Sequence, residues 1–590
     1  MSEKLLITTS LKKSWDEKKE MVFLGQWCQK FSNFKDLDKS KYEIFHYHWN
    51  DRKKLLEDYN YINKVYKKIL LNFKSILNEY HSVNYSERYW TIIIGPWLIT
   101  FLQVAFERYS NLNLFFKEKK NENYETIILK IKKDEFISKN YEEFTRYIQT
   151  DTWNHYLYSL MLDYSEFNFN VKKEYIEFID NENYKNFRKS KSLKNKIYNY
   201  LVGSFEKFFS KQDILISESY LGPKDEFNLA LNYLSLPRYS LGDLNNSNEF
   251  NDSRFDIKLN FNTENFFENF VKKNILSFMP ISFLEDFNSI GIKTKKMKWA
   301  KKPKIIFTSH FMPKTLQSRY TADCIEKNDT KLIVGQHGGV YGQYLFSTME
   351  DFELNVCDKF LSWGWKNNSN KVIPFGVIKN IKEANYNPNN KNLLMILRSQ
   401  TRYTHRLNSY SGSSQIKSYY EENVKLCKRL NQKIVENDLL LRFHSRKFGW
   451  DEEKLFQRNF DKVNIDMGYE KIANLLYSAK LVLQTYIGTG YLETLASNIP
   501  TIVYANIDEC LLNEETINNL NILKEANIYH DNYNSAADFI NQNWDKISSW
   551  WFSDLTQSAR KSFCLKYSKI NLNKVDDLKK IFNSFNNNQV

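Results

Sequence analysis

The chain has 590 residues, of which 42% are hydrophobic and 16% aromatic, so it is too long for a single core and too apolar to be intrinsically disordered. Its net charge of +14 is spread along the sequence in short basic runs, which favours solvated basic faces and leaves contact with an anionic surface as the alternative. The six cysteines have neither CxxC nor zinc-ligand spacing, so we expect no metal centre.

The N-terminal half begins with two short strand candidates, at 5–9 and 42–48, followed by helical patterns. Apolar residues recur at helical spacing over 52–80, and residues 87–212 look mostly helical and rich in aromatic residues. The apolar run at 89–106 is interrupted by glycine, proline and glutamine, so we expect a buried core segment rather than a membrane span. No cleavable signal pattern opens the chain, which predicts a cytoplasmic protein, soluble or peripheral to the membrane.

From residue 304 onward the sequence pattern predicts short apolar strands that alternate with helices. This alternation is typical of parallel sheets covered on both faces. A polar linker at 378–391 separates two such sets. The strand candidates lie at 304–310, 331–337, 359–365, 371–377, 392–398, 439–445, 462–466, 480–486 and 501–506. We therefore predict an α/β fold with two Rossmann-like domains that face a cleft, at 1–380 and 385–582, with a large helical insertion in the first. Ligands of such sheets bind at the carboxyl ends of the strands.

The segment GQHGGVYG, at 335–342, follows one of these strands. His337 stands at the strand end, where α/β enzymes keep reactive groups. Gly338 and Gly339 allow the backbone to approach a ligand closely. The alternative is a tight strand–helix turn in which His337 is hydrogen-bonded locally.

The segment LRFHSRKFG, at 441–449, places Arg442 and His444 on one face if the strand continues that far. Arginine and histidine together suit a phosphate or pyrophosphate group. A solvated edge strand is the alternative interpretation.

The segment QTYIGTGYLETLA, at 484–496, predicts a strand, a Thr/Gly turn and a helix. Free N–H groups at Thr489 and Gly490, together with the positive end of the helix, form an anion site. Glu493, expected in the first helical turn, is then placed to hold a sugar hydroxyl. The alternative is capping alone, with Gly490 as N-cap and Glu493 at the third helical position.

Two carboxylates in the N-terminal half are candidates for acid–base or nucleophilic chemistry. Asp51 lies in HYHWNDR and Glu218 in SESYLGP, both beside aromatic residues that favour burial. Burial raises the pKa of a carboxyl group and suits it to carry protons. Structural ion pairs explain such residues equally well.

These motifs together resemble a family of transferases from bacterial O-antigen and surface-polysaccharide gene clusters. The resemblance rests on HWNDRKKLLEDYNYI, RYWTIIIGPWL, GQHGGVYG with FLSWGW, and TGYLETLASNIPTI, and it runs over nearly the whole chain. The C-terminal half more broadly resembles GT-B glycosyltransferases. Arg442-Phe443-His444-Ser445 is similar to the Arg-x-His-Pro element of enzymes that use cytidine-nucleotide donors, with Ser445 in place of the usual proline.

The resemblance implies a GT-B-like, metal-independent glycosyltransferase that has no cofactor. Its donor would be a nucleotide sugar, CMP-linked and of the ulosonic or Kdo type, and its acceptor a surface glycan or lipid-linked glycan. Arg442, His444, Ser445, Thr489 and Gly490 would hold the donor phosphate. A CDP-polyol phosphotransferase, a nucleotide-sugar epimerase and a non-enzymatic membrane scaffold stay open as alternatives, and no nucleic-acid partner is expected.

Overall fold

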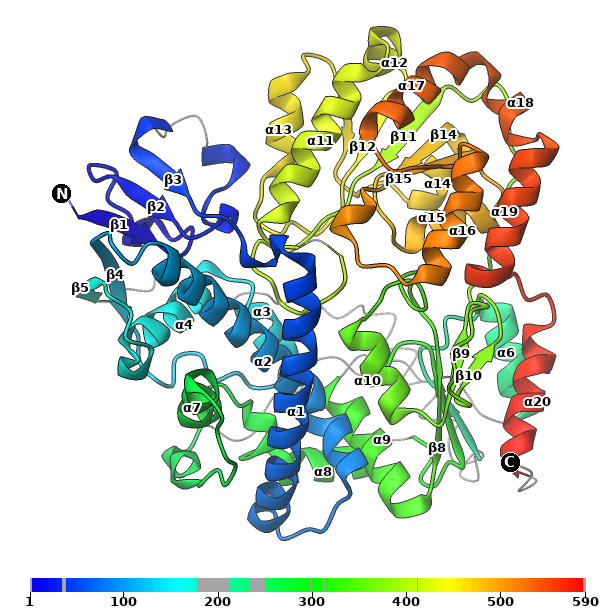
Figure 1. Ribbon diagram of the computed structural model, residues 1–590. Coiled ribbons are helices and arrows are strands. Elements are labelled where there is room, and N and C mark those ends of the chain that lie inside the picture. The colour runs from blue at the N-terminus through cyan, green and yellow to red at the C-terminus, as the bar shows by residue number, and fades with distance from the viewer. Residues whose placement is uncertain are drawn as a thin grey trace.

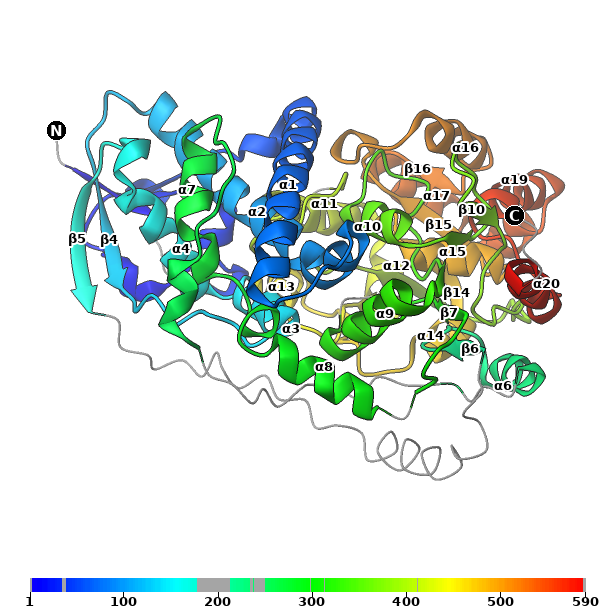
Figure 2. The same ribbon diagram turned by 90° about the horizontal axis from the view of Figure 1, so that it is seen from below.

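The computed structural model describes residues 3–33, 39–177, 213–233, 237, 250–297, 299–311, 314–410 and 412–586. Within these ranges the strands form three parallel sheets, called here the N-terminal, middle and C-terminal sheets (Figure 1). Helices α1 (Arg52–Tyr80) and α2 (Glu87–Glu118) lie between the N-terminal sheet and the middle sheet, as Figure 2 shows.

The N-terminal sheet has the order β3-β2-β1-β4-β5, which is that of the first five strands of a Rossmann fold. Its strands are β1 (Lys4–Ile7), β2 (Met21–Phe23), β3 (Tyr42–Ile44), β4 (Tyr124–Lys130) and β5 (Lys172–Glu177). The helices α3 (Tyr141–Tyr147), α4 (Asp151–Asp163) and α7 (Phe266–Asn274) belong to the same half of the molecule. β1 and β2 are buried on both faces, as expected for strands inside a covered parallel sheet.

Helix α2 is the central core helix of the N-terminal half. It is apolar on every side, and its most apolar stretch of 18 residues is entirely buried inside the protein. Among the described residues it alone is long and apolar enough to cross a membrane. Its complete burial confirms the predicted core segment at 89–106.

The middle sheet has the order β10-β9-β8-β7-β6. Its strands are β6 (Ile214–Ile216), β7 (Ile305–Thr308), β8 (Lys331–Gly335), β9 (Lys359–Ser362) and β10 (Val372–Pro374), and its helices include α6 (Pro223–Asn232), α8 (Phe287–Lys296), α9 (Thr315–Asn328) and α10 (Thr348–Val356). The last helix, α20 (Lys574–Asn586), returns to this sheet. Its Phe582 ring packs 5.6 Å from Phe307 of β7, so this last described helix packs against a sheet whose strands all precede the predicted linker.

The C-terminal sheet has the Rossmann order β13-β12-β11-β14-β15-β16. Its strands are β11 (Asn392–Ile396), β12 (Leu439–Arg442), β13 (Asn464–Asp466), β14 (Ala479–Gln484), β15 (Thr501–Tyr504) and β16 (Tyr529–His530). The helices are α11 (Gln415–Arg429), α12 (Gln432–Asn437), α13 (Glu452–Asn459), α14 (Ile472–Ser478), α15 (Thr489–Ala496), α16 (Glu514–Glu525), α17 (Tyr533–Asn543), α18 (Ile547–Trp551) and α19 (Asp554–Tyr567).

The middle and C-terminal sheets, whose parallel strands are joined mostly by helices, confirm the predicted α/β fold class. The N-terminal sheet corrects one part of that expectation, because the supposed helical stretch at 87–212 contains β4 and β5. Residues 178–212 of that stretch lie outside the described residues. The division into an acceptor domain at 1–380 and a donor domain at 385–582 stays a prediction.

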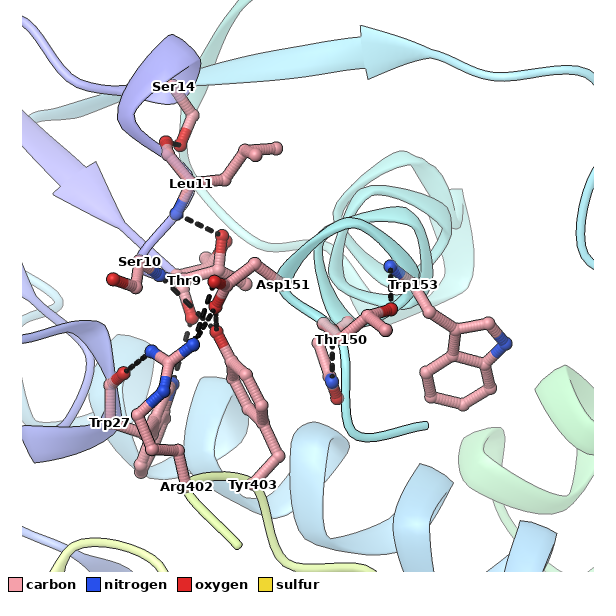
Figure 3. Close-up of polar contacts among 12 residues, drawn as sticks. Thr9, Ser10, Leu11, Ser14, Trp27, Thr150, Asp151, Trp153, Arg402 and Tyr403 are labelled. Carbon is pink, nitrogen blue, oxygen red and sulfur yellow. Dashed lines mark hydrogen bonds and ion pairs between the residues drawn. The ribbon is translucent and has the colours of Figure 1, made fainter. Parts of the chain in front are cut away.

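A buried charged cluster fixes the N-terminal unit, by which we mean the described residues between 3 and 177, against the segment that follows β11 (Figure 3). Nη2 of Arg402 donates to both carboxylate oxygens of Asp151 at 2.7 Å, and Nη1 donates to the carbonyl of Trp27 at 2.8 Å. The Tyr403 hydroxyl donates to Asp151 and accepts the backbone N–H of Ser10 at 3.3 Å. Burial acts to raise the pKa of Asp151, but the Arg402 charge and the hydrogen bonds outweigh it, so the pKa is lowered.

Candidate active site

Three titratable side chains meet at the carboxyl edge of the middle sheet. Glu218 follows β6, His310 follows β7, and His337 follows β8. Because these strands are neighbours and parallel, the residues that follow them lie side by side. The rings of His310 and His337 are 5.1 Å apart, and the Glu218 carboxylate acts on the pKa of His310. We call Glu218, His310 and His337 the acid–base cluster.

The acid–base cluster contains buried hydrogen-bonding atoms that no described residue satisfies. One oxygen of Glu218 accepts from the Lys314 ammonium, but its Oε2 has no partner, and neither do the Nδ1 atoms of His310 and His337. Each such atom costs about 1–3 kcal/mol. Glu218 and Tyr220 also adopt left-handed backbone conformations, with φ of +48° and +61°. Unpaired atoms and backbone strain at one place are typical of a ligand site.

Burial keeps the two histidines of the cluster neutral at neutral pH. The pKa of His337 is lowered to about 4, chiefly by burial and also by the neighbouring His310, Lys379 and Arg406. Burial also lowers the pKa of His310, where the Glu218 charge acts in the opposite direction and Lys314 in the same one. A neutral imidazole offers one nitrogen as a proton acceptor and the other as a donor, so both histidines are suited to general acid–base chemistry.

The turn after β8, which carries His337, is held from behind by Gln336. The side-chain amide of Gln336 donates to the carbonyl of Gly338 at 2.5 Å. Its carbonyl oxygen accepts from the Trp363 backbone at 2.8 Å and from the Trp365 indole at 2.7 Å. The FLSWGW motif therefore supports the GQHGG turn.

This turn touches the C-terminal sheet at the turn between β14 and α15. The backbone N–H of Gly339 donates to Oγ1 of Thr489 at 3.1 Å, and the Tyr344 hydroxyl donates to the carbonyl of Ile487 at 2.9 Å. A Cβ on Gly339 would lie 2.6 Å from the carbonyl oxygen of Gly488, so only glycine fits there. The carboxyl edges of the two sheets thus meet at a contact zone that we call the junction.

Helix α15 begins at the junction with Gly488 as its N-cap. The Gln484 side chain before it is 1% exposed, and both of its polar atoms lack partners among the described residues. A Cβ on Gly490 would lie 2.8 Å from Oε1 of Gln484, which explains the glycine. An unpaired buried amide beside a helix N-terminus is suited to an anionic group.

Glu493 lies in the second turn of α15, so its predicted place in the first turn and the capping-box alternative are both wrong. Its carboxylate pairs with the Lys379 ammonium at 2.6 Å, with each side chain about one-third exposed. The same ammonium lies 5.4 Å from the centre of the Tyr220 ring. Lys379 therefore links α15 to the strand end that carries Glu218.

Arg442, His444 and Ser445 lie two strands away from the junction, after β12. The strand ends at Arg442, so the predicted alternation does not extend to His444. Arg442 pairs with Asp466 and donates to the carbonyl of Glu470 at 3.0 Å, and His444 Nδ1 accepts the backbone N–H of Arg446 at 2.9 Å. Their phosphate-binding role stays a prediction.

Asp51 is the N-cap of α1. Its carboxylate accepts the backbone N–H groups of Lys53 and Lys54 at 3.0 and 3.1 Å, and the side chain is exposed. The contacts recorded for it within the described residues are those of a helix cap. Its role as base or nucleophile stays a prediction.

Sequence reasoning missed His310, Lys314 and Lys379. His310 ends the segment KIIFTSH and obeys the rule that singled out His337, a histidine at the carboxyl end of an apolar strand. Lys379 was hidden in the segment predicted as a linker. Lys314 carries no signal in the sequence, because only the fold brings it to Glu218.

A cavity of about 470 Å³ lies between the N-terminal unit and the C-terminal sheet. Its walls include Gln26, His46 and Arg52 from the N-terminal side, and Gln415 and Glu509 from the C-terminal side. A much smaller cavity shares Arg52 and Gln415 with it and is also lined by Arg406, whose charge reaches His337.

The sequence profile of the LIC12162 family transferases matches residues 4–582. The chain belongs to this family. It is accordingly a transferase, and the resemblance drawn from the motifs is confirmed at that level. No curated protein matches the chain. Among solved structures, MurG of Acinetobacter baumannii is similar at 9% identity, with 63% of this chain and 99% of that chain covered and a TM-score of 0.32. The fold assignment above rests on strand order and not on this likeness.

Proposed function

We propose that this LIC12162 family transferase is a glycosyltransferase that moves a sugar from a nucleotide donor to a glycan hydroxyl at the junction. The observation that supports this most strongly is the acid–base cluster with its unpaired buried atoms, at a sheet edge that contacts the first turn of α15 through Gly339 and Thr489. Transfer from a nucleotide sugar needs a proton acceptor for the incoming hydroxyl and a charged surface for the leaving phosphate.

In this mechanism the acceptor hydroxyl attacks the anomeric carbon while the bond from that carbon to the phosphate oxygen breaks. His310 takes the hydroxyl proton, and the Glu218 carboxylate stabilises the imidazolium that forms. The nucleoside phosphate leaves with the bonding electron pair. The Lys379 ammonium and the N–H groups of Thr489 and Gly490 stabilise its negative charge. These groups supply the stabilisation without a metal ion, so metal independence is part of the proposal.

The sequence motifs support a more specific choice of donor sugar and acceptor. The similarity of Arg442–Ser445 to cytidine-donor enzymes supports a CMP-linked ulosonic sugar, with Glu493 binding a ribose or sugar hydroxyl. The cavity beside Arg52 and Gln415 supports an acceptor glycan that enters from the N-terminal side. A surface polysaccharide or lipid-linked glycan, assembled at the cytoplasmic face of an anionic membrane, fits the motif resemblance.

The test is donor turnover by the full chain. CMP-Kdo, CMP-sialic acid, UDP-glucose and GDP-mannose are each incubated with enzyme, and release of free nucleotide is followed by chromatography. His310→Asn should reduce release by about 100-fold or more. His530→Asn, at a histidine of the edge strand β16 that lies outside the acid–base cluster and outside the cavity, is the matched control and should keep the wild-type rate.

Three outcomes would contradict this proposal or part of it. Release of CMP from a CDP-polyol, but from none of the sugar donors, would favour the polyol phosphotransferase. Conversion of a donor to its epimer without an acceptor would favour the epimerase. A rate unchanged in His310→Asn would remove the acid–base cluster from the chemistry.

A further inference from the structure

A carboxyl group lies directly behind His337 and has no assigned role. Glu353 of α10 is 0% exposed. Neither of its oxygens meets hydrogen-bond geometry with a described residue, although the Tyr341 hydroxyl interacts with the carboxyl group and acts to lower its pKa. Its Oε1 is 3.7 Å from Nδ1 of His337, which is the buried and unpaired nitrogen of that ring. The two atoms are thus within ion-pair distance, slightly farther apart than in a hydrogen bond.

This arrangement lowers the stability of the fold if it serves only packing. An unsatisfied buried carboxyl group destabilises the fold, and an apolar residue of similar volume would fill the same space at lower cost. The neighbouring acid on the same helix behaves differently: Glu350 accepts the backbone N–H of Gly342 at 3.1 Å and so has a structural partner. Glu353 therefore calls for a functional explanation.

We infer that Glu353 is a positioning residue for His337: its carboxyl group engages Nδ1 and leaves Nε2 to face the ligand. The inference rests on the proposed function for its catalytic consequence, but the pairing itself does not depend on it. The His337 side chain keeps 19% exposure although Nδ1 is buried, so the opposite side of the ring is the accessible one. Catalytic hydrogen bonds are often long in ligand-free structures and tighten when the ligand binds.

The protonation states determine what His337 offers. Burial raises the pKa of Glu353 to about 8, with Tyr341 acting to lower it and Glu350 to raise it. Near pH 7 the carboxyl O–H donates to Nδ1, so the neutral imidazole carries its proton on Nε2 and donates toward a leaving phosphate. When Glu353 ionises, Nδ1–H donates to the carboxylate and Nε2 becomes an acceptor. The charges of Lys379 and Arg406, with His310 adjacent, disfavour the imidazolium, so the tautomer changes rather than the charge.

The test uses nitrogen-15 NMR of the nine histidines in the full chain, without any nucleotide. His337→Asn identifies the His337 signals. In the wild type these signals should report the Nε2–H tautomer at pH 6.5 and convert to Nδ1–H as the pH rises through about 8. Glu353→Gln, whose amide still donates to Nδ1, should hold Nε2–H throughout. Glu353→Leu should remove the pH response.

Glu350→Gln is the matched control, because it removes a buried carboxyl from the same helix without touching His337. Its His337 signals should still convert between the two tautomers, at a somewhat lower pH because Glu350 no longer raises the pKa of Glu353. The inference is overturned if the His337 tautomer does not change with pH in the wild type, or if Glu353→Leu leaves the pH response unchanged.

Activity separates this inference from the proposed function. If the enzyme turns over a nucleotide sugar, Glu353→Leu should lower kcat by about 100-fold with little change in KM, since the ring is misplaced but the donor still binds. If no donor turns over, the proposed function fails while the tautomer result still decides whether Glu353 positions His337.

Discussion

Removing Asp151 should loosen the N-terminal unit from the rest of the enzyme. Arg402 is only 5% exposed, and without the carboxylate its guanidinium keeps the Trp27 carbonyl at 2.8 Å as its main partner. Breaking a buried ion pair by deleting one partner costs about 3–5 kcal/mol. We therefore expect Asp151→Ala to lower the melting temperature of the unit by about 6–20 °C.

Differential scanning fluorimetry combined with limited proteolysis measures this effect. The double variant Asp151→Leu with Arg402→Met replaces the pair by apolar side chains, and it should recover most of the lost stability. Because the pKa of Asp151 is lowered in the folded state, the contribution of the pair is present above the ordinary carboxyl pKa and disappears as the pH falls through the lowered value. A loss below about 1 kcal/mol in Asp151→Ala, or a double variant as unstable as the single one, would refute the reasoning.

Further predictions concern the junction and the buried acids. Gly339→Ala should weaken nucleotide binding and destabilise the protein by about 1–3 kcal/mol, because its Cβ would meet the Gly488 carbonyl at 2.6 Å. Gly338→Ala, whose Cβ would have its nearest neighbour 3.7 Å away, is the control and should be tolerated in the same calorimetric and thermal assays. Burial raises the pKa of Glu350 to about 8, so this group makes the fold less stable as the pH rises from about 4.5 to 8. Glu350→Gln should flatten that decline in thermal unfolding, and an unchanged slope would contradict the assignment. Lys379→Met should cost under about 1 kcal/mol of stability, since its ion pair is partly exposed, yet it should reduce nucleotide affinity clearly.

The sequence predicted the C-terminal sheet well because its central strands β11, β14 and β15 are mostly buried on both faces and appear as continuous apolar runs. The segment at 480–486 and the strand β14 illustrate this, since Leu481 to Leu483 are all completely buried. β5 escaped prediction because it is a polar edge strand without the alternation that one buried face produces. β4 was concealed between two helical stretches that dominated the local pattern.

The candidate site could be located from the sequence only in outline. His337 and Thr489 were found because each follows an apolar strand, and the structure brings their two turns into contact. Glu493 was assigned to the wrong helical turn because α15 starts one residue before Gly490, with Gly488 as its cap. Glu353 gave no signal, since its importance arises from a distance to His337 that only the fold creates.

Calorimetric titration of the full chain with CMP, CDP, UDP and GDP at two salt concentrations tests the donor site most directly. We predict that at least one nucleotide binds at both salt concentrations and that Gly339→Ala weakens it while Gly338→Ala does not. CMP as the best ligand would support the ulosonic-sugar donor, and UDP or GDP would replace that donor while keeping the site. Binding of no nucleotide, or binding that ignores Gly339→Ala, would contradict a donor site at the junction.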